Sequence, residues 1–398
     1  MKEGWEYKKL GELALSMADG PFGSNLKKEH YTNRKEVRII QLSNIGEEGW
    51  REDNTKYTSF EHLETIKRSE VTPGDLVIAK MMPAGRAIIC PNNESKYVLS
   101  SDAVRVTLKE GLNNRFILFS INSPYFRKQV YENVSGSGRV RTSLTKLRDC
   151  KIYLPSLSEQ QSIVAYLDSA FAKIDTMKAN AEKALNEAKA LFQASLKEML
   201  EPKEGWTTST LKDECYKITD GTHQTPKYYP SGYIFLSSKN VTSRKIDWEN
   251  VKYIDESQHQ IMHQRVAPKV GDILLAKNGT TGVAAMVDRD IIFDIYVSLA
   301  LLRSKGNVTP EYLLTFVNSP IAKEQFNKRL IGMGVPNLHL GEINQVVITY
   351  PKDKREQAKM TQRIEELDNL IIRLQANFDK ISQECDALKQ AILRQVFE

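Results

Sequence analysis

The chain contains little cysteine and no long apolar run. Its four cysteines lie far apart, at positions 90, 150, 215 and 385, and form no C-x-x-C pair. This scatter argues against a zinc ribbon or a disulfide framework and is typical of a reducing cytoplasm. The most apolar stretch, residues 291–302, is interrupted by Asp294 and is shorter than the roughly 18 residues of a membrane span. Residues 1–6 lack the apolar core of a signal peptide, so we expect a cytoplasmic protein without membrane association.

The sequence also lacks the motifs of several enzyme classes. It contains no G-x-x-x-x-G-K-[S/T] loop to hold a nucleoside triphosphate and no Asn-Pro-Pro-aromatic run of a DNA amino-methyltransferase. The apolar runs that end at Lys80 and Lys277 carry no carboxylate where a metal-dependent nuclease needs one. His259 and His263 are four residues apart and could share a metal on one helix face, but the sequence offers no third ligand placed to complete a site. We therefore predict no catalytic residue, no metal and no cofactor on this chain.

What the chain does contain is a duplication of about half its length. Motifs recur in the same order at an offset that drifts only between 201 and 196 residues. The pairs are Glu3-Gly4-Trp5 with Glu204-Gly205-Trp206, Asp19-Gly20 with Asp220-Gly221, the run 74–80 with 271–277, Asn122-Ser123-Pro124 with Asn318-Ser319-Pro320, and Pro155 with Pro351. Because the order is kept through loops as well as strands, the pattern predicts two equivalent modules rather than a solenoid. Two diverged modules suit a protein that makes one kind of contact twice with different specificity.

Each module is followed by a helical segment of some 40 residues without internal proline or glycine. Both segments begin after a proline with a capping box, Ser156 with Glu159 and Asp353 with Glu356. Apolar residues then follow at alternating spacings of four and three, which indicates a coiled coil. The predicted interface residues are Ile163, Leu167, Ile174, Met177, Leu191, Ile364, Leu367, Ile371, Leu374, Phe378, Ile381, Leu388 and Ile392. The first seam is rich in alanine and the second in larger side chains, so we pair the helices antiparallel within the chain, although pairing between chains stays open.

The remaining segments predict strand-rich modules of mixed α/β character. Strands are expected at 38–42, 75–79, 98–108, 233–236, 272–276 and 291–303, and helices at 116–133 and 310–328. The predicted fold class is α+β, with two mixed, strand-rich domains separated by a long antiparallel coiled coil of two helices and related by a pseudo-two-fold axis. The expected boundaries are 1–155 for the first domain, 156–202 for the first helical spacer, 203–352 for the second domain and 353–398 for the second spacer.

The net charge of +6 is unevenly distributed. Residues 156–202 carry five basic and seven acidic side chains, and residues 353–398 carry eight and nine, so the two modules together hold +9. A basic globular part on a near-neutral helical frame suits a polyanion, most simply nucleic acid. Charge alone leaves open that these are ordinary surface lysines.

At this point the sequence resembles a known family, the specificity subunit of type I restriction–modification systems. The resemblance is carried by Asp220-Gly221-Thr222-His223 and its counterpart Asp19-Gly20-Pro21-Phe22, by Gly-Asp-Ile-Leu-Leu-Ala-Lys at 271–277, by Asn278-Gly279-Thr280-Thr281-Gly282, by Pro336-Asn337-Leu338, and by Glu-Gln at the start of each long helix. Each motif alone is weak, but their repeated order is specific and covers essentially the whole chain.

The resemblance implies a subunit that binds DNA without cutting or methylating it. Each target recognition domain would read one half of a bipartite target in double-stranded DNA, and the coiled coil would set the gap and dock two methyltransferase subunits. Restriction and translocase subunits would join through the complex, and S-adenosylmethionine and ATP would bind those partners rather than this chain. The alternative is a non-enzymatic coiled-coil scaffold that joins two protein-binding domains.

The candidate DNA contacts divide into phosphate-positioning and base-reading side chains. Arginine in a glycine-rich loop can pair with guanine and asparagine with adenine, whereas lysines that follow strands suit phosphates. His223 is interpreted as a turn or DNA-facing residue rather than a general base. The candidates are Lys27, Lys28, Lys80, Arg86, Arg139, Arg141, Lys146, His223, Lys239, Arg244, Lys277, Asn278, Asn337 and His339.

Overall fold

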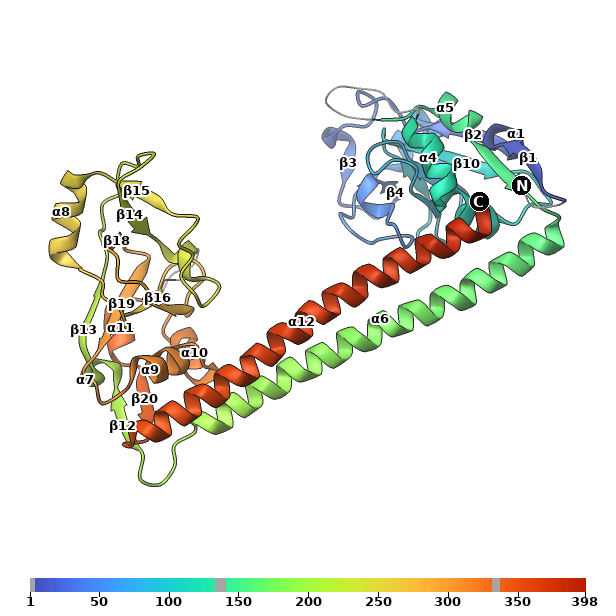
Figure 1. Cartoon of the computed structure of the whole chain (residues 1–398). Helices are drawn as coiled ribbons and strands as arrows, with labels where there is room; N and C mark the ends of the chain where they lie inside the picture. Colours follow the sequence, from blue (N-terminus) through green and yellow to red (C-terminus); the bar gives the residue numbers. More distant parts are fainter. Residues whose placement is uncertain (1–3, 133–140, 331–336) are drawn as a thin grey trace. The chain divides into compact units, whose positions relative to one another are not determined.

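The computed structural model of the chain describes residues 4–132, 141–330 and 337–398 (Figure 1). The chain divides into two compact units, one of Met1–Ala181 with Asp379–Glu398 and the other of Glu182–Phe378. The two long helices, α6 (Leu157–Leu200) and α12 (Lys354–Phe397), contribute one segment each to both units. Each unit therefore combines a strand-rich module with two helix segments, which confirms the predicted α+β class.

The first module is built from two sheets and one strand pair. Strands in the order β2-β10-β7-β8 form an antiparallel sheet, and strands in the order β3-β5-β4-β9-β6 form a mixed sheet in which β4 and β9 are parallel. The pair β1-β11 joins the start of the module to its end. The strands are β1 (Glu6–Lys9), β2 (Ala14–Asp19), β3 (Tyr31–Thr32), β4 (Val37–Ile40), β5 (Tyr57–Thr58), β6 (Glu70–Val71), β7 (Leu76–Ala79), β8 (Ala87–Ile89), β9 (Tyr97–Leu99), β10 (Ala103–Leu108) and β11 (Lys151–Leu154). The α-helices are α1 (Leu10–Leu13), α2 (Phe60–Thr65), α3 (Asn114–Asn122), α4 (Pro124–Glu132) and α5 (Leu144–Asp149).

The second module repeats this arrangement. Its pair β12-β20, its antiparallel sheet β13-β19-β16-β17 and its mixed sheet β15-β14-β18 match the first module strand for strand, except for β3 and β6. The strands are β12 (Thr207–Thr210), β13 (Cys215–Asp220), β14 (Tyr233–Leu236), β15 (Lys252–Ile254), β16 (Ile273–Ala276), β17 (Ala284–Met286), β18 (Phe293–Ile295), β19 (Leu299–Ser304) and β20 (Val347–Tyr350). The α-helices are α7 (Leu211–Glu214), α8 (Glu256–Arg265), α9 (Pro310–Val317), α10 (Pro320–Asn327) and α11 (Leu340–Asn344).

The strands and helices expected from the sequence are present, with four subdivisions. Residues 98–108 and 291–303 each form two short strands, residues 116–133 form two helices, and residues 310–328 also form two helices rather than one. The second helix of that pair begins at Pro320, where Ser319 accepts a hydrogen bond from the backbone N–H of Ala322. Proline suits the first helical turn because it has no N–H to satisfy there. In the first module the same Asn-Ser-Pro motif separates α3 from α4.

The repeated Asp-Gly motif has a steric cause. A Cβ atom at Gly20 would lie 1.7 Å from the carbonyl oxygen of Ser100, and one at Gly221 would lie 1.8 Å from that of Ile295. Only glycine lets the two backbone segments approach this closely. Both modules therefore fix the position of the aspartate that precedes the glycine.

The repeated Glu-Gln motif connects each long helix to its module. Gln160 is buried, accepts a hydrogen bond from the backbone N–H of Asn113 at 3.0 Å and donates to the carbonyl of Pro155 at 2.9 Å. Gln357 repeats this with Thr309 at 2.8 Å and Pro351 at 2.9 Å. Asn113 and Thr309 are the N-caps of α3 and α9. Each buried glutamine therefore joins the start of a long helix to the start of a module helix.

The predicted capping box at Ser156 is realised only in part. The hydroxyl of Ser156 accepts from the backbone N–H of Glu159 at 3.3 Å, as a cap does. The carboxylate of Glu159 accepts from the indole N–H of Trp5 at 2.8 Å instead of completing the box. The repeated Glu-Gly-Trp motif thus contacts the long helix in the first module.

The two long helices pack antiparallel within each unit. In the first unit Lys178 pairs with Asp386 at 3.1 Å and Asp175 with Lys389 at 2.5 Å, so rising numbers in α6 meet falling numbers in α12. Of the predicted interface residues, Leu167, Ile174 and Ile364 are buried, and six more are partly buried. Those six are Ile163, Leu367, Ile371, Phe378, Ile381 and Ile392.

Four predicted interface residues are wrong. Met177, Leu191, Leu374 and Leu388 expose 60%, 69%, 42% and 48% of their surface. In each case the side chain one position later is more buried. One residue turns a helix by about 100°, which is enough to move a side chain off the seam.

The residues that replace them are mostly polar. Phe192 is buried, whereas Lys178, Gln375 and Lys389 are partly buried and form polar contacts across the helix pair. Gln375 accepts a hydrogen bond from Lys189 at 2.6 Å in the second unit. The apolar spacing places the seam one residue too early at these positions, because an apolar residue stands immediately before each polar one.

Candidate nucleic-acid interface

In the first module the end of a central strand meets Arg141 and Thr142, which follow the glycine-rich stretch 135–138 in the sequence. Met81, two residues after β7, forms an isolated β-bridge with Arg141. The backbone N–H of Thr142 donates to the carbonyl of Lys80 at 2.9 Å. Residues separated by about 60 positions are therefore adjacent here, although the sequence identified them as two separate candidate segments.

The second module repeats this junction with different side chains. Asn278 forms the β-bridge with Asn337, and the backbone N–H of Leu338 donates to the carbonyl of Lys277 at 2.8 Å. The same backbone geometry thus presents Met81 and Arg141 in one module and two asparagines in the other. We call these two places the bridge loops.

The bridge loop of the first module presents a guanidinium group at the surface. Arg141 has a half-exposed side chain that pairs with the carboxylate of Asp102. Lys146 lies in α5, partly exposed, where the hydroxyl of Ser143 caps the helix. Arg139 lies outside the described residues.

The bridge loop of the second module presents amides. The side-chain oxygens of Asn278 and Asn337 are buried and have no hydrogen-bond partner among the described residues. Buried polar atoms are normally hydrogen-bonded, so two such oxygens without a partner among the described residues are unusual. His339 is exposed at the N-cap of α11, two residues beyond Asn337.

Lys277 is not a surface cation, which corrects its assignment as a phosphate contact. It is 4% exposed and pairs with Asp220 at 3.2 Å. Lys80 occupies the equivalent position, pairs with Asp19 at 2.6 Å and is mostly buried. Asp19 and Asp220 belong to the two Asp-Gly motifs. Each lysine therefore holds the strand end that precedes a bridge loop, through its ion pair with the aspartate.

Two further basic side chains, His223 and Arg265, contact the carboxylate of Asp220. His223 Nε2 lies 3.2 Å and Arg265 Nη2 lies 2.8 Å from the same carboxylate oxygen. Burial alone would raise the pKa of Asp220, but hydrogen bonds from Lys277, His223 and Arg265 outweigh it and hold the pKa below the ordinary value of 3.8. The side chains of His223 and Arg265 are more than half exposed, so Arg265 brings positive charge to the surface and His223 places an imidazole beside it.

Arg265 was missed in the sequence because no local motif marks it. It ends α8, 45 residues from Asp220 in the sequence, and only the tertiary packing brings the two together. A basic residue in the last turn of a helix is commonplace, since it interacts favourably with the helix dipole.

The other candidate cations fall into two groups. Lys27, Lys28 and Lys239 are exposed, and within the described parts of the chain only Lys27 forms an ion pair, with Glu29 at 3.6 Å. Arg86 is partly exposed and donates to the carbonyl of Pro83. The exposed lysines are therefore available to an anion.

Arg244 forms an ion pair with the long helix α12. Its guanidinium lies 3.5 Å from Asp368 of α12, and its backbone has a positive φ of 61°. The side chain is still nearly half exposed. Its observed contact is therefore with α12, within the second unit.

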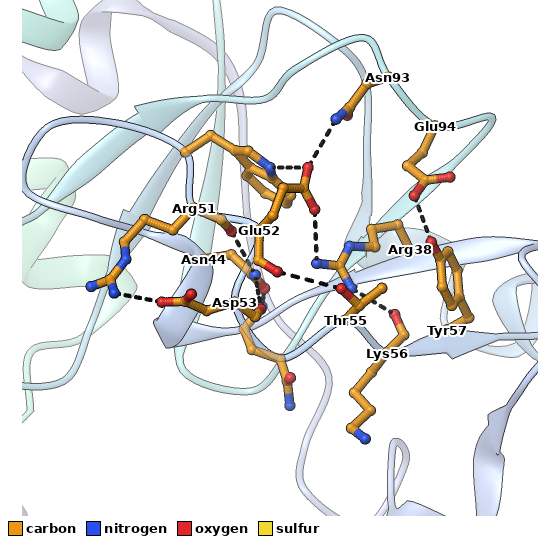
Figure 2. Close-up of polar contacts among 12 residues, drawn as sticks. Arg38, Asn44, Arg51, Glu52, Asp53, Thr55, Lys56, Tyr57, Asn93 and Glu94 are labelled. Carbon is orange, nitrogen blue, oxygen red and sulfur yellow. Dashed lines mark hydrogen bonds and ion pairs between the residues drawn. The ribbon is translucent and has the colours of Figure 1, made fainter. Parts of the chain in front are cut away.

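The first module also contains a buried arginine that the sequence placed in an apolar strand. Arg38 in β4 is fully buried and lies over the rings of Trp50 and Tyr57, at 5.8 and 5.6 Å. Figure 2 shows its guanidinium between the carboxylate of Glu52, 3.5 Å away, and the backbone of Lys56.

Hydrogen bonds hold this arginine's acidic partner in place. Glu52 accepts from Trp50 at 2.7 Å and from Asn93 at 2.9 Å (Figure 2). These bonds, chiefly the one from Trp50, lower the pKa of Glu52 and keep it ionised beside Arg38. In the second module Ile234 occupies the equivalent position in the strand register, so this cluster belongs to one module only.

Comparison with known proteins identifies the family. The family model of the type I restriction modification DNA specificity domain matches residues 2–187 and again residues 203–381. The chain is 21% identical to the EcoKI specificity subunit of Escherichia coli K12, over all of this chain and 89% of that protein. It is 26% identical to the MjaVIII specificity subunit of Methanocaldococcus jannaschii, over 69% of this chain and 68% of that protein.

A solved structure has the same fold. It comes from a study of complex assembly and conformational transition of the type I R-M system, and it covers all of this chain and 98% of its own with a TM-score of 0.75 at 18% identity. Among the described residues no helix combines the length and apolar character needed to cross a membrane. The family model accounts for both modules and most of both long helices, so the chain belongs to the type I restriction–modification specificity family, as the DNA specificity subunit and a non-catalytic part of the enzyme complex.

Proposed function

We propose that each module reads one half of a bipartite target in double-stranded DNA through its bridge loop. The observation that carries this proposal is the repetition of one backbone junction with different side chains. Arginine can donate to both major-groove acceptors of guanine, whereas asparagine can pair with adenine. Arg141 in one module and Asn278 with Asn337 in the other would therefore favour different base pairs. A repeated backbone junction that presents different side chains is expected of two readers of unlike half-sites.

The exposed basic side chains would position the modules on the phosphate backbone. His223 and Arg265 lie at the Asp-Gly corner of the second module, and Lys27, Lys28 and Lys239 are free of buried partners. Contacts of this kind set register and orientation but carry no sequence information. They would also make binding fall steeply with salt, because bound phosphates release counterions.

The domain division supports the same proposal. We assign residues 1–155 and 203–352 to the two recognition domains and residues 156–202 and 353–398 to helical spacers related by a pseudo-two-fold axis. A stiff antiparallel helix pair would fix the unread gap, as dimer geometry fixes half-site spacing in other DNA-binding proteins. The exposed apolar side chains Met177, Leu191, Leu374 and Leu388 offer contact area for methyltransferase subunits. Two such subunits are expected because the frame is duplicated, with S-adenosylmethionine and ATP bound by partner subunits.

Selection from a random DNA library tests the proposal. The full chain, purified with its methyltransferase partner, should enrich two short sequence blocks at a fixed separation. Enrichment of a single block would contradict reading by both modules. Salt-sensitive binding without any enriched sequence would leave a non-specific DNA binder, and no binding at all would favour a protein-binding scaffold.

A further inference from the structure

Two histidines of α8 converge on one buried aspartate of β18. His259 Nδ1 lies 2.6 Å from one carboxylate oxygen of Asp294, and His263 Nδ1 lies 3.2 Å from the other. One ligand atom from each residue can be chosen so that all lie within 4.8 Å of one another. Figure 1 shows α8 beside β14, β15 and β18 in the second unit. We call these three side chains the His-His-Asp cluster.

The duplication provides an internal control for this cluster. Ser59 and Asp255 cap α2 and α8 in the same way, each accepting from the backbone N–H three residues later. Four residues after each cap, Leu63 in the first module stands where His259 stands in the second. The parallel strand register likewise aligns Val98 of β9 with Asp294 of β18.

At these positions the first module is apolar. Leu63 and Val98 are buried in a cluster with Val37, Ile39 and Ile66. The fold therefore does not need polar side chains here. Placing a carboxylate and an imidazole in such a site is unfavourable unless a partner compensates for their desolvation.

The buried carboxylate of Asp294 favours a cation at this site. Asp294 is 1% exposed, and the groups that donate to it among the described residues are the two histidines. A divalent ion between the carboxylate and the imidazoles would neutralise this buried charge.

The donor set fits zinc better than a hard cation. Zn²⁺ binds histidine nitrogen at about 2.0–2.1 Å and carboxylate oxygen at about 2.0–2.2 Å, whereas Mg²⁺ and Ca²⁺ prefer oxygen ligands. Tetrahedral bonds of that length separate ligand atoms by about 3.3 Å. The 3.2 Å between His263 Nδ1 and Asp294 matches this separation, whereas the 2.6 Å between His259 Nδ1 and Asp294 would lengthen on metal binding. The His263 side chain is 30% exposed, which leaves room for water as a fourth ligand.

The neighbouring side chains hold the ligands in orientation. The ring of His259 stacks on Tyr233 with centroids 3.8 Å apart and planes at 8°. The i, i+4 spacing places His263 on the same face of α8, one turn further along. To bind the metal through Nδ1, each imidazole would carry its proton on Nε2, and bonds to the metal would replace the hydrogen bonds to Asp294.

We propose that His259, His263 and Asp294 bind one Zn²⁺, with water as the fourth ligand, and that the metal fastens α8 to β18. The site would stabilise the helix whose last residue, Arg265, reaches Asp220. Three of the four thiols are poor competitors for the metal, because burial raises the pKa of Cys90, Cys150 and Cys215 to about 12. This site is independent of which DNA bases the bridge loops contact.

The test uses the full chain freed of metal with a chelator. Titration calorimetry with Zn²⁺ should show one ion per chain and a higher thermal midpoint. Co²⁺ should give the visible bands of a tetrahedral site without a thiolate charge-transfer band. His263→Asn and Asp294→Asn should each weaken binding at least about tenfold, since even outer-shell changes cost that much. As a control, His62→Gln should leave zinc binding unchanged, because among the described residues His62, which stacks on His30 in the first module, belongs to no group of three metal-ligating side chains.

A double variant keeps the proposal falsifiable if single variants fail to fold. His259→Leu with Asp294→Val copies the apolar pair Leu63 and Val98 of the first module, so it should fold and lose both the zinc and the Co²⁺ bands. Unchanged zinc binding in this variant, or no zinc binding by the wild-type chain, would overturn the proposal. Stability that depends on pH but not on Zn²⁺ would show that the cluster only shares protons, which also overturns it.

Discussion

Asp220 and Lys277 form a buried ion pair of 3.2 Å, and Asp19 and Lys80 form the equivalent pair at 2.6 Å in the other module, where the aspartate is partly exposed. In the second module the pair joins the end of β13 to the end of β16, on either side of β19. In the first module it joins the end of β2 to the end of β7, on either side of β10. The lysine immediately precedes a bridge-loop residue. The pair therefore fixes the base of the loop, and its role in DNA recognition is indirect.

Removing the lysine should leave a buried carboxylate short of a partner. Lys277→Met should destabilise the second unit by about 3 kcal/mol, since breaking one side of a buried pair is strongly unfavourable. Urea titration of the full chain measures this loss, with the exposed Lys28→Met as the matched control at near zero. The salt dependence of DNA binding should be unchanged by Lys277→Met. A salt slope reduced by about one would show that Lys277 contacts a phosphate after all.

The same carboxylate should make stability depend on acid. Because the pKa of Asp220 in the folded chain lies below its ordinary value of 3.8, the folded state binds fewer protons there than the unfolded state. The stabilisation is complete above that ordinary value and is lost as the pH falls toward the lower folded pKa. Thermal midpoints measured from pH 7 down to pH 3 should therefore fall less steeply in Asp220→Asn than in the wild type. Equal slopes would mean that Asp220 is not paired in solution.

The repeated motifs predicted the duplication, the α+β class and the long helices well, because each depends on local pattern. Glycines that a Cβ would block, such as Gly20, and buried glutamines, such as Gln160, recur because the backbone needs them. The bridge loops were predicted as separate segments, since the contact between Met81 and Arg141 is long-range. Asp294 was not linked to His259 for the same reason: parallel strand pairing brings it beside α8.

The helix seam shows a different limit of sequence patterns. At positions 388 and 389 two adjacent residues could each occupy the heptad position. The apolar pattern favours Leu388, yet Lys389 lies at the interface. Its amine pairs with Asp175 and Glu48, and its long aliphatic stem can cover apolar surface. Apolar spacing alone cannot show which of two adjacent residues faces the partner helix when the residue at the interface is an ion-paired lysine.

Two adjacent residues of α6 should separate helix packing from partner docking. Phe192 is buried and Leu191 is 69% exposed. Phe192→Ala should lower the free energy of unfolding by about 3–5 kcal/mol through the cavity it leaves. Leu191→Ala should leave the stability of the isolated chain within about 0.5 kcal/mol and weaken assembly with the methyltransferase subunit. Analytical ultracentrifugation of the reconstituted complex measures assembly, and unaltered assembly would remove Leu191 from the proposed docking surface.

Arg141 should distinguish base reading from phosphate binding. If its guanidinium pairs with both acceptors of a guanine, Arg141→Ala should cost about 1–3 kcal/mol of binding and relax preference at one position of one half-site. Arg141→Lys keeps the charge but loses the bidentate fork, so it should relax that preference almost as much while retaining the salt slope. Library selection with both variants provides the comparison, and Asp102→Asn controls for loss of the ion pair that orients the arginine. Equal weakening on all sequences, with full recovery in Arg141→Lys, would instead assign Arg141 to a phosphate.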